Sequence, residues 1–242
     1  MQLRVAALYP TLMNLYGDRG NIATLRERCR ARGIEFELTE VHLGDSLDPH
    51  AHELLLMGGG QDREQQRCAE DLREHKAGAL HEMVADGRVL LAVCGGYQLF
   101  GHYYRSADGQ ELTGIGIFDA YTVHPGADVP RCIGNLAISW EGDTLVGFEN
   151  HGGRTYLGTT AALGRVVAGA GNNGEDGFEG ARVNNTFGSY LHPILPKNPR
   201  FADRLVELAL EHRYGEVSLT PLDDRLEDDA HSVALKIALK RR

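Results

Sequence analysis

The chain has 242 residues, of which 42% are hydrophobic and 24% are charged, and its formal net charge is −9. This composition is typical of a globular protein that is long enough to bury a large core. The negative charge argues against nucleic acid as a partner, because contact with a phosphate backbone needs a basic face. We find no apolar run as long as a membrane span and no signal peptide, so the sequence predicts no direct membrane insertion and no secretion.

The four cysteines, Cys29, Cys68, Cys94 and Cys132, lie far apart and form no CxxC pair. We therefore expect neither a disulfide framework nor a zinc site. The histidines and acidic residues at positions 48–53 are interpreted as a solvated loop, so no metal site is predicted. A reducing compartment fits free cysteines best, and the predicted location is cytoplasmic.

The first hundred residues alternate between strand and helix patterns. Strand patterns cover residues 3–9, 34–41, 53–57 and 88–93. Helix patterns cover residues 21–33, with Asn21 as the cap, 62–75 and 97–105. Strands that alternate with helices predict βαβ units and an α/β fold with a mostly parallel sheet flanked by helices.

The middle of the chain, residues 112–190, shows short strand patterns separated by Gly and Asn turns, which indicates further strands, some of them antiparallel. Asn198 and Pro199 then predict the start of a helix that ends at Gly215. We expect one domain over residues 1–215. A C-terminal tail over residues 216–242 is expected to end in a short amphipathic helix around Val233, Ile237 and Leu239. The sequence leaves open whether this helix packs on the core or on a partner protein.

The strongest local feature is the segment LLAVCGGYQ at residues 90–98. A buried strand ends at Cys94, two glycines follow, and a helix begins. Such a turn exposes a nucleophile above the sheet, and the N-terminus of a helix stabilises a thiolate. A lone cysteine is more often a small buried side chain. The strand, the glycines and the helix together favour an activated Cys94, whereas the other three cysteines fit the buried interpretation.

A nucleophilic cysteine needs a base, and His192 has the most suitable position. It follows the strand pattern at residues 187–191, and the ends of parallel strands are where active-site groups gather. His151, in the segment ENHGG, is the alternative base. Spacing alone leaves open whether either residue is a hydrogen-bonded structural histidine.

Two glycine-rich segments follow strand patterns or turns. The segment GGGQD at residues 58–62 can supply backbone N–H groups to an oxyanion, with a second donor from Gly95, and no GK[ST] follows that would make it a phosphate loop. The segment GAGNNG at residues 169–174 matches GxGxxG. No helix pattern follows it, so we interpret it as a polar loop and not as a dinucleotide site.

Together these residues resemble the class I glutamine amidotransferases, which implies a flavodoxin-like fold. The segments CGGYQ at 94–98, GGGQ at 58–61 and YLH at 190–192 are similar to the CobB/CobQ branch, which includes cobyric acid synthases. Residues 8–21, 59–65, 147–155 and 195–199 are more similar still to the glutaminase subunits of lipid II isoglutaminyl synthase. The resemblance covers about residues 3–212.

The resemblance implies a reaction and the residues that carry it out. Cys94 attacks the side-chain amide of L-glutamine, and His192 takes the thiol proton and passes it to the departing ammonia. The amides of Gly60 and Gly95 stabilise the oxyanion. Water then releases glutamate.

The resemblance also implies substrate-binding residues. Arg131 matches the arginine that anchors the carboxylate of glutamine, for which a guanidinium is suited, and Gln98 supports the bound glutamine. One position departs from the wider class, which places a glutamate two residues after the histidine, where this chain has Ile194. We therefore expect a Cys94–His192 dyad, with any third group supplied from elsewhere or by a partner, and a slow isolated subunit.

No cofactor is implied for this chain, which carries no ATP-binding motif. ATP and Mg²⁺ are expected on a MurT-like Mur ligase subunit that forms a heterodimer with the chain. That partner would use the ammonia to amidate the D-glutamate of lipid II to D-isoglutamine in peptidoglycan biosynthesis. Contact with lipid II would be made only through the partner.

Three further interpretations remain open at the level of sequence. The chain could serve another ATP-dependent synthetase, for example in cofactor biosynthesis. It could be a non-glutaminase cysteine hydrolase on the same scaffold, such as a peptidase, although Arg131 and Gln98 argue against this. It could also be a non-catalytic binding subunit that retains the fold.

Overall fold

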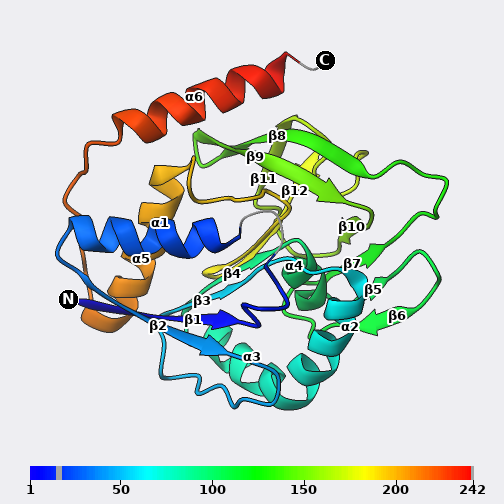
Figure 1. The fold of residues 1–242 in the computed structure, drawn as a ribbon, viewed down its shortest axis with the longest axis horizontal. Coiled ribbons are helices and arrows are strands. Elements are labelled where there is room, and N and C mark those ends of the chain that lie inside the picture. Colours follow the sequence, from blue (N-terminus) through cyan, green and yellow to red (C-terminus); the bar gives the residue numbers. More distant parts are fainter. Residues whose placement is uncertain (15–17, 241–242) are drawn as a thin grey trace.

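The computed structural model describes residues 1–14 and 18–240 (Figure 1). Residues 15–17, part of the 8–21 segment that carries the family resemblance, and residues 241–242 of the tail lie outside the described residues.

The centre of the molecule is a six-stranded sheet with the strand order β13-β14-β4-β3-β1-β2. Its strands are β1 (Gln2–Leu8), β2 (Glu35–Val41), β3 (Leu54–Met57), β4 (Val89–Val93), β13 (Ala181–Val183) and β14 (Thr186–Ser189). All neighbouring pairs are parallel except β13 and β14. The order 2-1-3-4-14 is that of flavodoxin-like folds, so the predicted α/β class is confirmed.

Helices cover both faces of this sheet, which explains why β3 and β4 are apolar and buried at every position. On one face lie α1 (Arg19–Ala31) and α5 (Pro199–Tyr214) (Figure 1). On the other lie α2 (Asp62–Asp71), the π-helical turn η1 (Leu72–Lys76) and α3 (Ala77–Ala85). The buried ammonium of Lys76 pairs with Asp71 across the π-helical turn, and the helix predicted to end at residue 75 continues beyond it.

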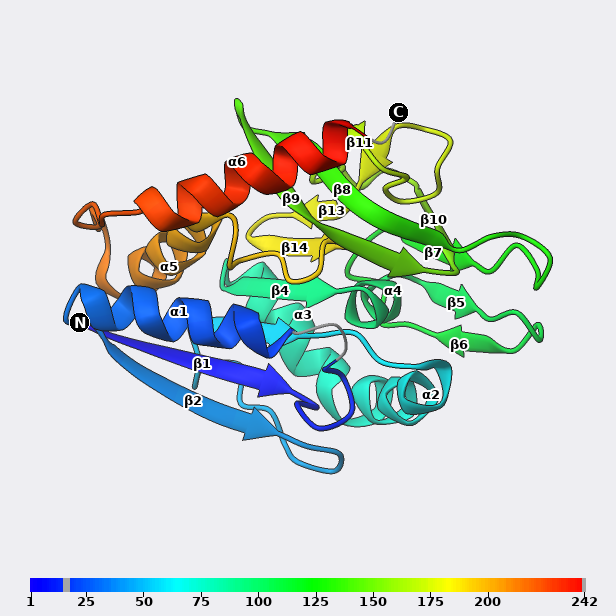
Figure 2. The same ribbon diagram turned by 45° about the horizontal axis from the view of Figure 1, so that its top comes forward.

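Two smaller sheets lie beside the central one (Figure 2). One contains β5 (Tyr103–Arg105), β6 (Glu111–Thr113), β7 (Ala120–Val123) and β10 (Arg154–Leu157). The other is antiparallel and contains β8 (Cys132–Trp140), β9 (Asp143–His151), β11 (Gly164–Ala168) and β12 (Phe178–Glu179). Strand β9 also contacts the chain just after β14, because the backbones of Phe148 and His192 exchange hydrogen bonds of 2.9 and 2.8 Å.

Two further predicted helix limits are wrong. The helix expected over residues 97–105 is α4 (Gly95–Phe100), and residues 103–105 form β5 because they pair with β6 and β7. Asn21 does not cap α1, which begins at Arg19. The Asn21 side chain instead accepts a hydrogen bond of 3.0 Å from the backbone of Leu195, in the segment that follows His192.

The tail contains a longer helix than expected, α6 (Arg225–Leu239), which lies along β8 and β9 (Figure 2). Its packed side presents Ala234, Leu235 and Ala238 to a small cluster on those strands. Val233 and Ile237, around which the amphipathic stretch was predicted, are 54% and 46% exposed. The division of the chain at residue 215 stays a prediction. None of the helices in the described ranges is long and apolar enough to cross a membrane.

Candidate active site

Four parallel strands of the central sheet end at the same edge, and the candidate residues follow these ends. β1 leads toward Asp18, β3 into the glycines at 58–60, β4 into Cys94, and β14 toward His192. In open α/β sheets this carboxyl edge is where ligands bind. Sequence positions that are far apart are therefore brought into one site.

Cys94 occupies a strained turn between β4 and α4. Its φ is +52°, in the left-handed region that is costly for a residue other than glycine, and strain of this kind often marks a functional position. The turn is held on both sides: the Cys94 amide donates to the Ser189 carbonyl at 2.8 Å, and its own carbonyl accepts from the Gln98 amide at 3.0 Å. The predicted strand-to-helix elbow is thus present, with the helix starting directly at Gly95.

His192 is buried, and its ring joins Cys94 to a carboxylate. Its Nδ1 lies 3.0 Å from Asp18 Oδ1, and the ring lies beside Cys94, because a Cβ on Gly59 would meet both side chains. The second oxygen of Asp18 accepts the Gly59 amide at 2.8 Å. Of the expected alternatives, a Cys94–His192 dyad alone or one with a third group from elsewhere or from a partner, the second fits the contact of Asp18 with His192.

The charge of His192 follows from these contacts. Burial by itself lowers the pKa of the imidazole, but the hydrogen bonds to Asp18 and Cys94, together with their negative charge, raise the pKa of His192 to about 10. The protonated ring is therefore stabilised next to the thiol. A protonated imidazole is the kind of neighbour that activates a cysteine nucleophile in cysteine enzymes.

The glycines beside Cys94 are needed because the backbone approaches the reacting groups closely. A Cβ at Gly59 would lie 3.1 Å from Cys94 Cβ and 3.3 Å from His192 Cε1. A Cβ at Gly95 would lie 2.4 Å from Gln65 Nε2 and 3.1 Å from the Gly60 amide nitrogen. The Gly59 amide is engaged by Asp18, while Gly60 and Gly95, the two predicted oxyanion donors, lie close to each other beside Cys94.

An open cleft of about 460 Å³ leads to the cysteine, and four predicted residues line it: Gly60, Cys94, Gln98 and Arg131. Gly95 and His192 are not part of this lining. Arg131 is exposed, and its guanidinium donates to the side chain and the backbone carbonyl of Asn150, both at 3.1 Å. The positively charged guanidinium of Arg131 therefore lies at the same cleft as the Cys94 thiol.

Gln98 forms part of the cleft wall, and both ends of its side-chain amide are engaged by protein groups. Its oxygen accepts from Gln65 at 2.8 Å and its nitrogen donates to the Tyr190 hydroxyl at 3.2 Å. The side chain is therefore fixed in orientation. Its support of a bound substrate stays a prediction.

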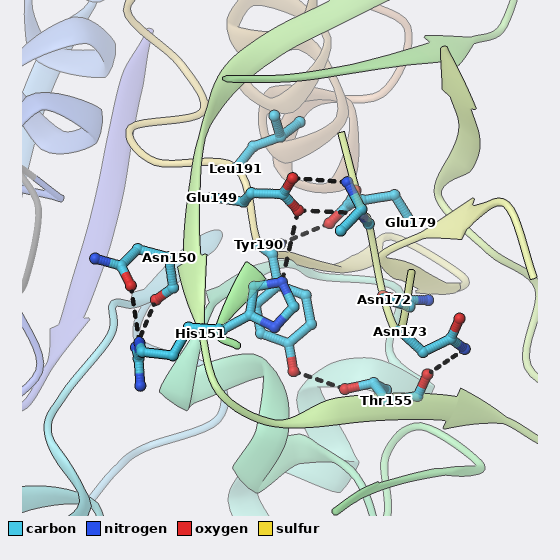
Figure 3. A network of polar contacts seen from close by, with 12 residues as sticks. Glu149, Asn150, His151, Thr155, Asn172, Asn173, Glu179, Tyr190 and Leu191 are labelled. Carbon is cyan, nitrogen blue, oxygen red and sulfur yellow. Dashed lines mark hydrogen bonds and ion pairs between the residues drawn. The ribbon is translucent and has the colours of Figure 1, made fainter. Parts of the chain in front are cut away.

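His151, the alternative base, lines the same cleft, and Figure 3 shows its ring against that of Tyr190. Its ring stacks on Tyr190 with 3.7 Å between centroids and 10° between planes. Its Nδ1–H donates to the Gly153 carbonyl at 2.8 Å. The histidine that lies beside Cys94 is His192.

The sequence analysis missed two acidic residues of the site. Asp18 directly precedes α1, a position where aspartate commonly caps a helix, but its side chain makes no capping bond and turns to His192 and Gly59 instead. Asp62 lines the cleft at the start of α2 and accepts from the Tyr104 hydroxyl at 3.3 Å. Among residues 1–14 and 18–240, no group of three or more His, Cys, Asp or Glu side chains could hold a metal ion.

A flavodoxin-like sheet that carries a strained cysteine and a histidine at its carboxyl edge is the arrangement expected of the class I glutamine amidotransferases, although the acid here is Asp18 and not the glutamate of the wider class. The chain belongs to the CobB/CobQ-like glutamine amidotransferase domain family, whose model matches residues 4–199.

Its relatives include two proteins of nearly the same length. It is 42% identical to the lipid II isoglutaminyl synthase (glutamine-hydrolyzing) subunit GatD of Streptococcus pneumoniae, over 94% of this chain and 88% of that one. It is 40% identical to the subunit of the same name from Staphylococcus aureus, over 95% of this chain and 93% of that one. The chain is thus a glutamine-hydrolysing amidotransferase component, as the sequence analysis expected.

Solved structures share the fold at low sequence identity. PurLQS from Thermotoga maritima has a TM-score of 0.61 at 16% identity, over 88% of this chain and 99% of that one. The glutaminase domain of Trypanosoma brucei CTPS, solved with bound acivicin, has a TM-score of 0.56 at 12% identity, over 89% of this chain and 98% of that one.

Proposed function

We propose that this chain is the glutaminase subunit of a lipid II isoglutaminyl synthase and that it hydrolyses L-glutamine to glutamate and ammonia with Cys94, His192 and Asp18. The observation that carries the proposal is that His192, held by Asp18 at 3.0 Å, lies beside Cys94, which lines the cleft. The near full-length identity of 42% and 40% to subunits of that name supports the choice of synthase.

The proposed reaction uses each of these groups in turn. The Cys94 thiolate adds to the side-chain amide carbon of glutamine, and the oxyanion accepts hydrogen bonds from the amides of Gly60 and Gly95. The His192 imidazolium gives its proton to the nitrogen, ammonia leaves, and a thioester remains. Water, deprotonated by His192, then attacks the thioester and releases glutamate. Asp18 holds the ring and balances its charge throughout.

The charges at the cleft fit a free amino acid. Arg131 offers a guanidinium to the α-carboxylate, and Asp62, on the lining of the same cleft, offers a carboxylate to the α-ammonium. The side chain of glutamine would then extend between them toward Cys94. Gln98, held in one orientation by Gln65 and Tyr190, would form the wall along which it lies.

Ammonia would be consumed by a second subunit. We propose a MurT-like Mur ligase partner that binds ATP and Mg²⁺, forms a heterodimer with this chain in the cytoplasm, and amidates the D-glutamate of lipid II to D-isoglutamine. The word "subunit" in the names of both relatives supports a partner. No cofactor is proposed for this chain.

The test is glutamate release from L-glutamine by the purified chain, alone and with the candidate Mur ligase, ATP and lipid II. We expect release by the chain alone and amidated lipid II from the pair. Cys94→Ala should abolish both, while free ammonium should restore amidation without restoring glutamate release. Unchanged amidation by Cys94→Ala with glutamine as the nitrogen source would overturn the proposal in favour of a non-catalytic subunit.

The same experiment distinguishes this subunit from a glutaminase of another synthetase and from a different cysteine hydrolase. Glutamate release without amidation of lipid II, combined with copurification of another ATP-dependent synthetase, would assign the chain to that synthetase. No glutamate release and no labelling of Cys94 by a glutamine-analogue electrophile would point to a different cysteine hydrolase.

A further inference from the structure

The end of β9 holds the guanidinium of Arg131 in place at the cleft. The pairing of β8 with β9 sets Cys132 opposite His151 and Ile133 opposite Asn150, so Arg131 emerges beside the turn at residues 150–153. The Arg131 guanidinium donates twice to Asn150. A Cβ at Gly152 would lie 3.1 Å from Arg131 Nη1, so this turn forms the support of the guanidinium. The position of Arg131 therefore depends on the shape of the turn.

His151 closes that turn. Its side chain is 2% exposed, and its Nδ1–H donates to the Gly153 carbonyl at 2.8 Å, across the two glycines. The adjacent carbonyl of Gly152 accepts from Arg154 at 2.9 Å. Glycines have the widest choice of backbone conformations, so a turn with two of them needs such contacts to keep one shape.

The same histidine ring covers the residue that holds Gln98. It lies flat on Tyr190, which is fully buried. The Tyr190 hydroxyl bonds Thr155 Oγ1 at 2.6 Å and accepts from Gln98 Nε2 at 3.2 Å. His151 therefore contacts two groups: the turn that supports Arg131, and Tyr190, whose hydroxyl holds Gln98.

The ring of His151 is backed by Glu149 and by the glycine-rich loop that matched GxGxxG. Glu149 Oε2 lies 3.6 Å from His151 Nε2, and the carboxylate accepts the amides of Ala170 at 2.7 Å and Gly171 at 3.0 Å. A Cβ at Gly169 would lie 2.7 Å from Glu149 Oε1. The glycines of this loop therefore permit its backbone to bind a carboxylate of the protein itself, at the position behind His151.

We infer that His151 is a positioning residue for glutamine: through the 150–153 turn it fixes Arg131, and through Tyr190 it fixes Gln98, while it takes no part in activating Cys94. The inference rests on the proposed function. The groups proposed to activate Cys94 are the neighbouring His192 and its partner Asp18, which are a different set of residues. Loss of His151 should therefore weaken the binding of glutamine and leave the reactivity of the thiol unchanged.

The test compares two readouts on the full-length chain. Glutamate release gives KM and kcat for L-glutamine, and alkylation of Cys94 by iodoacetamide reports the thiol without needing a carboxylate anchor. In His151→Phe, which keeps a planar ring but loses the bond to Gly153, we expect KM to rise about tenfold, with kcat within about twofold and the alkylation rate unchanged. His151→Asn, which can still donate at the Nδ1 position, should recover part of the loss.

A matched control is His81→Phe, because His81 also bonds a backbone carbonyl through its ring, at 2.7 Å to Ile115, but on α3 and away from the cleft. It should keep the KM of the wild type. If His151→Phe does not fold, Tyr190→Phe tests the same path, since it removes the hydroxyl that holds Gln98 and keeps the ring beneath His151.

An unchanged KM in the folded His151→Phe variant, or in Tyr190→Phe where that variant replaces it, would overturn the inference. So would an alkylation rate that falls as far as kcat/KM, because His151 would then act on the thiol. A wild-type chain that releases no glutamate would overturn the proposed function itself, which separates the two failures.

Discussion

Asp18 Oδ1 lies 3.0 Å from His192 Nδ1, although 174 positions separate the two residues in the chain. Through its other oxygen, Asp18 also accepts the amide of Gly59. One carboxylate therefore fixes the ring of the histidine and the loop that carries Gly60. The orientation of the base and that of an oxyanion donor depend on the same side chain.

Asp18→Asn should keep the size of the side chain while removing its charge. We expect kcat for glutamine to fall by about 10²-fold or more, because the ring loses the group that sets its tautomer and stabilises its charge. The measurement is glutamate release under saturating glutamine. The matched control is Asp119→Asn, which alters a second histidine–aspartate pair, with His102 at 2.9 Å on the surface. Equal activities of the two variants would contradict the role given to Asp18.

The pH dependence tests the charge state of His192. The raised pKa, about 10, means that the imidazolium persists above the ordinary value of about 6.5 and is lost only as the pH rises through about 10. The kcat/KM of the wild type should therefore decline only near that upper pH. In Asp18→Asn the hydrogen bond and charge that raise the pKa are lost, so the decline should move toward neutral pH. An alkaline limb at the same pH in both proteins would contradict this.

The site residues that could be predicted from sequence are those that lie in a recognisable pattern of neighbouring residues along the chain. Cys94 was found because a strand, two glycines and a helix are contiguous, and His192 because it ends a strand. Asp18 could not be found in this way, since its contact with His192 depends on the neighbouring positions of β1, β3, β4 and β14 in the sheet. The position where the wider class has glutamate carries Ile194, which is fully buried in the core.

The loop at residues 169–174 also has a contact that the sequence could not predict. Its pattern was interpreted as a polar loop because no helix follows, and the chain there does lack a helix between β11 and β12. What the pattern could not indicate was its partner. The backbone amides of Ala170 and Gly171 bind Glu149, a residue on a different strand, and only the packing of the sheets brings them together.

Gly59→Ala should disrupt the site although it adds a single methyl group. The new Cβ would lie 3.1 Å from Cys94 Cβ and 3.3 Å from His192 Cε1, so the two reacting side chains must shift apart. We expect kcat/KM to fall by about tenfold or more, since small displacements of reacting groups are costly. Gly78→Ala is the control: no atom lies within 4 Å of its Cβ, and it lies within helix α3. It should retain activity and stabilise the fold by about 0.5–1 kcal/mol in urea unfolding.

Arg131→Lys should separate binding from chemistry at the cleft. Lysine keeps the positive charge but loses the planar fork that can bind a carboxylate with two hydrogen bonds. We expect KM for glutamine to rise by about tenfold while the alkylation of Cys94 by iodoacetamide stays unchanged. The control is Arg105→Lys, because Arg105 is an exposed residue at the end of β5 that pairs with Glu111 at 2.9 Å. A KM that does not change in Arg131→Lys would remove Arg131 from the substrate site.

His231 on α6 tests how the tail helix is attached to the domain. Its Nδ1–H donates to the Lys197 carbonyl at 2.8 Å and its Nε2 accepts from the Thr144 hydroxyl at 2.8 Å, so one ring joins α6 to β9 and to the segment before α5. His231→Ala should lower the free energy of unfolding by about 1–2 kcal/mol, because both partners lose a hydrogen bond. Ser232→Ala, at the exposed neighbouring position, should lower it by no more than about 0.5 kcal/mol. Urea unfolding measures both, and equal stabilities of the two variants would mean that α6 is held by its apolar contacts alone.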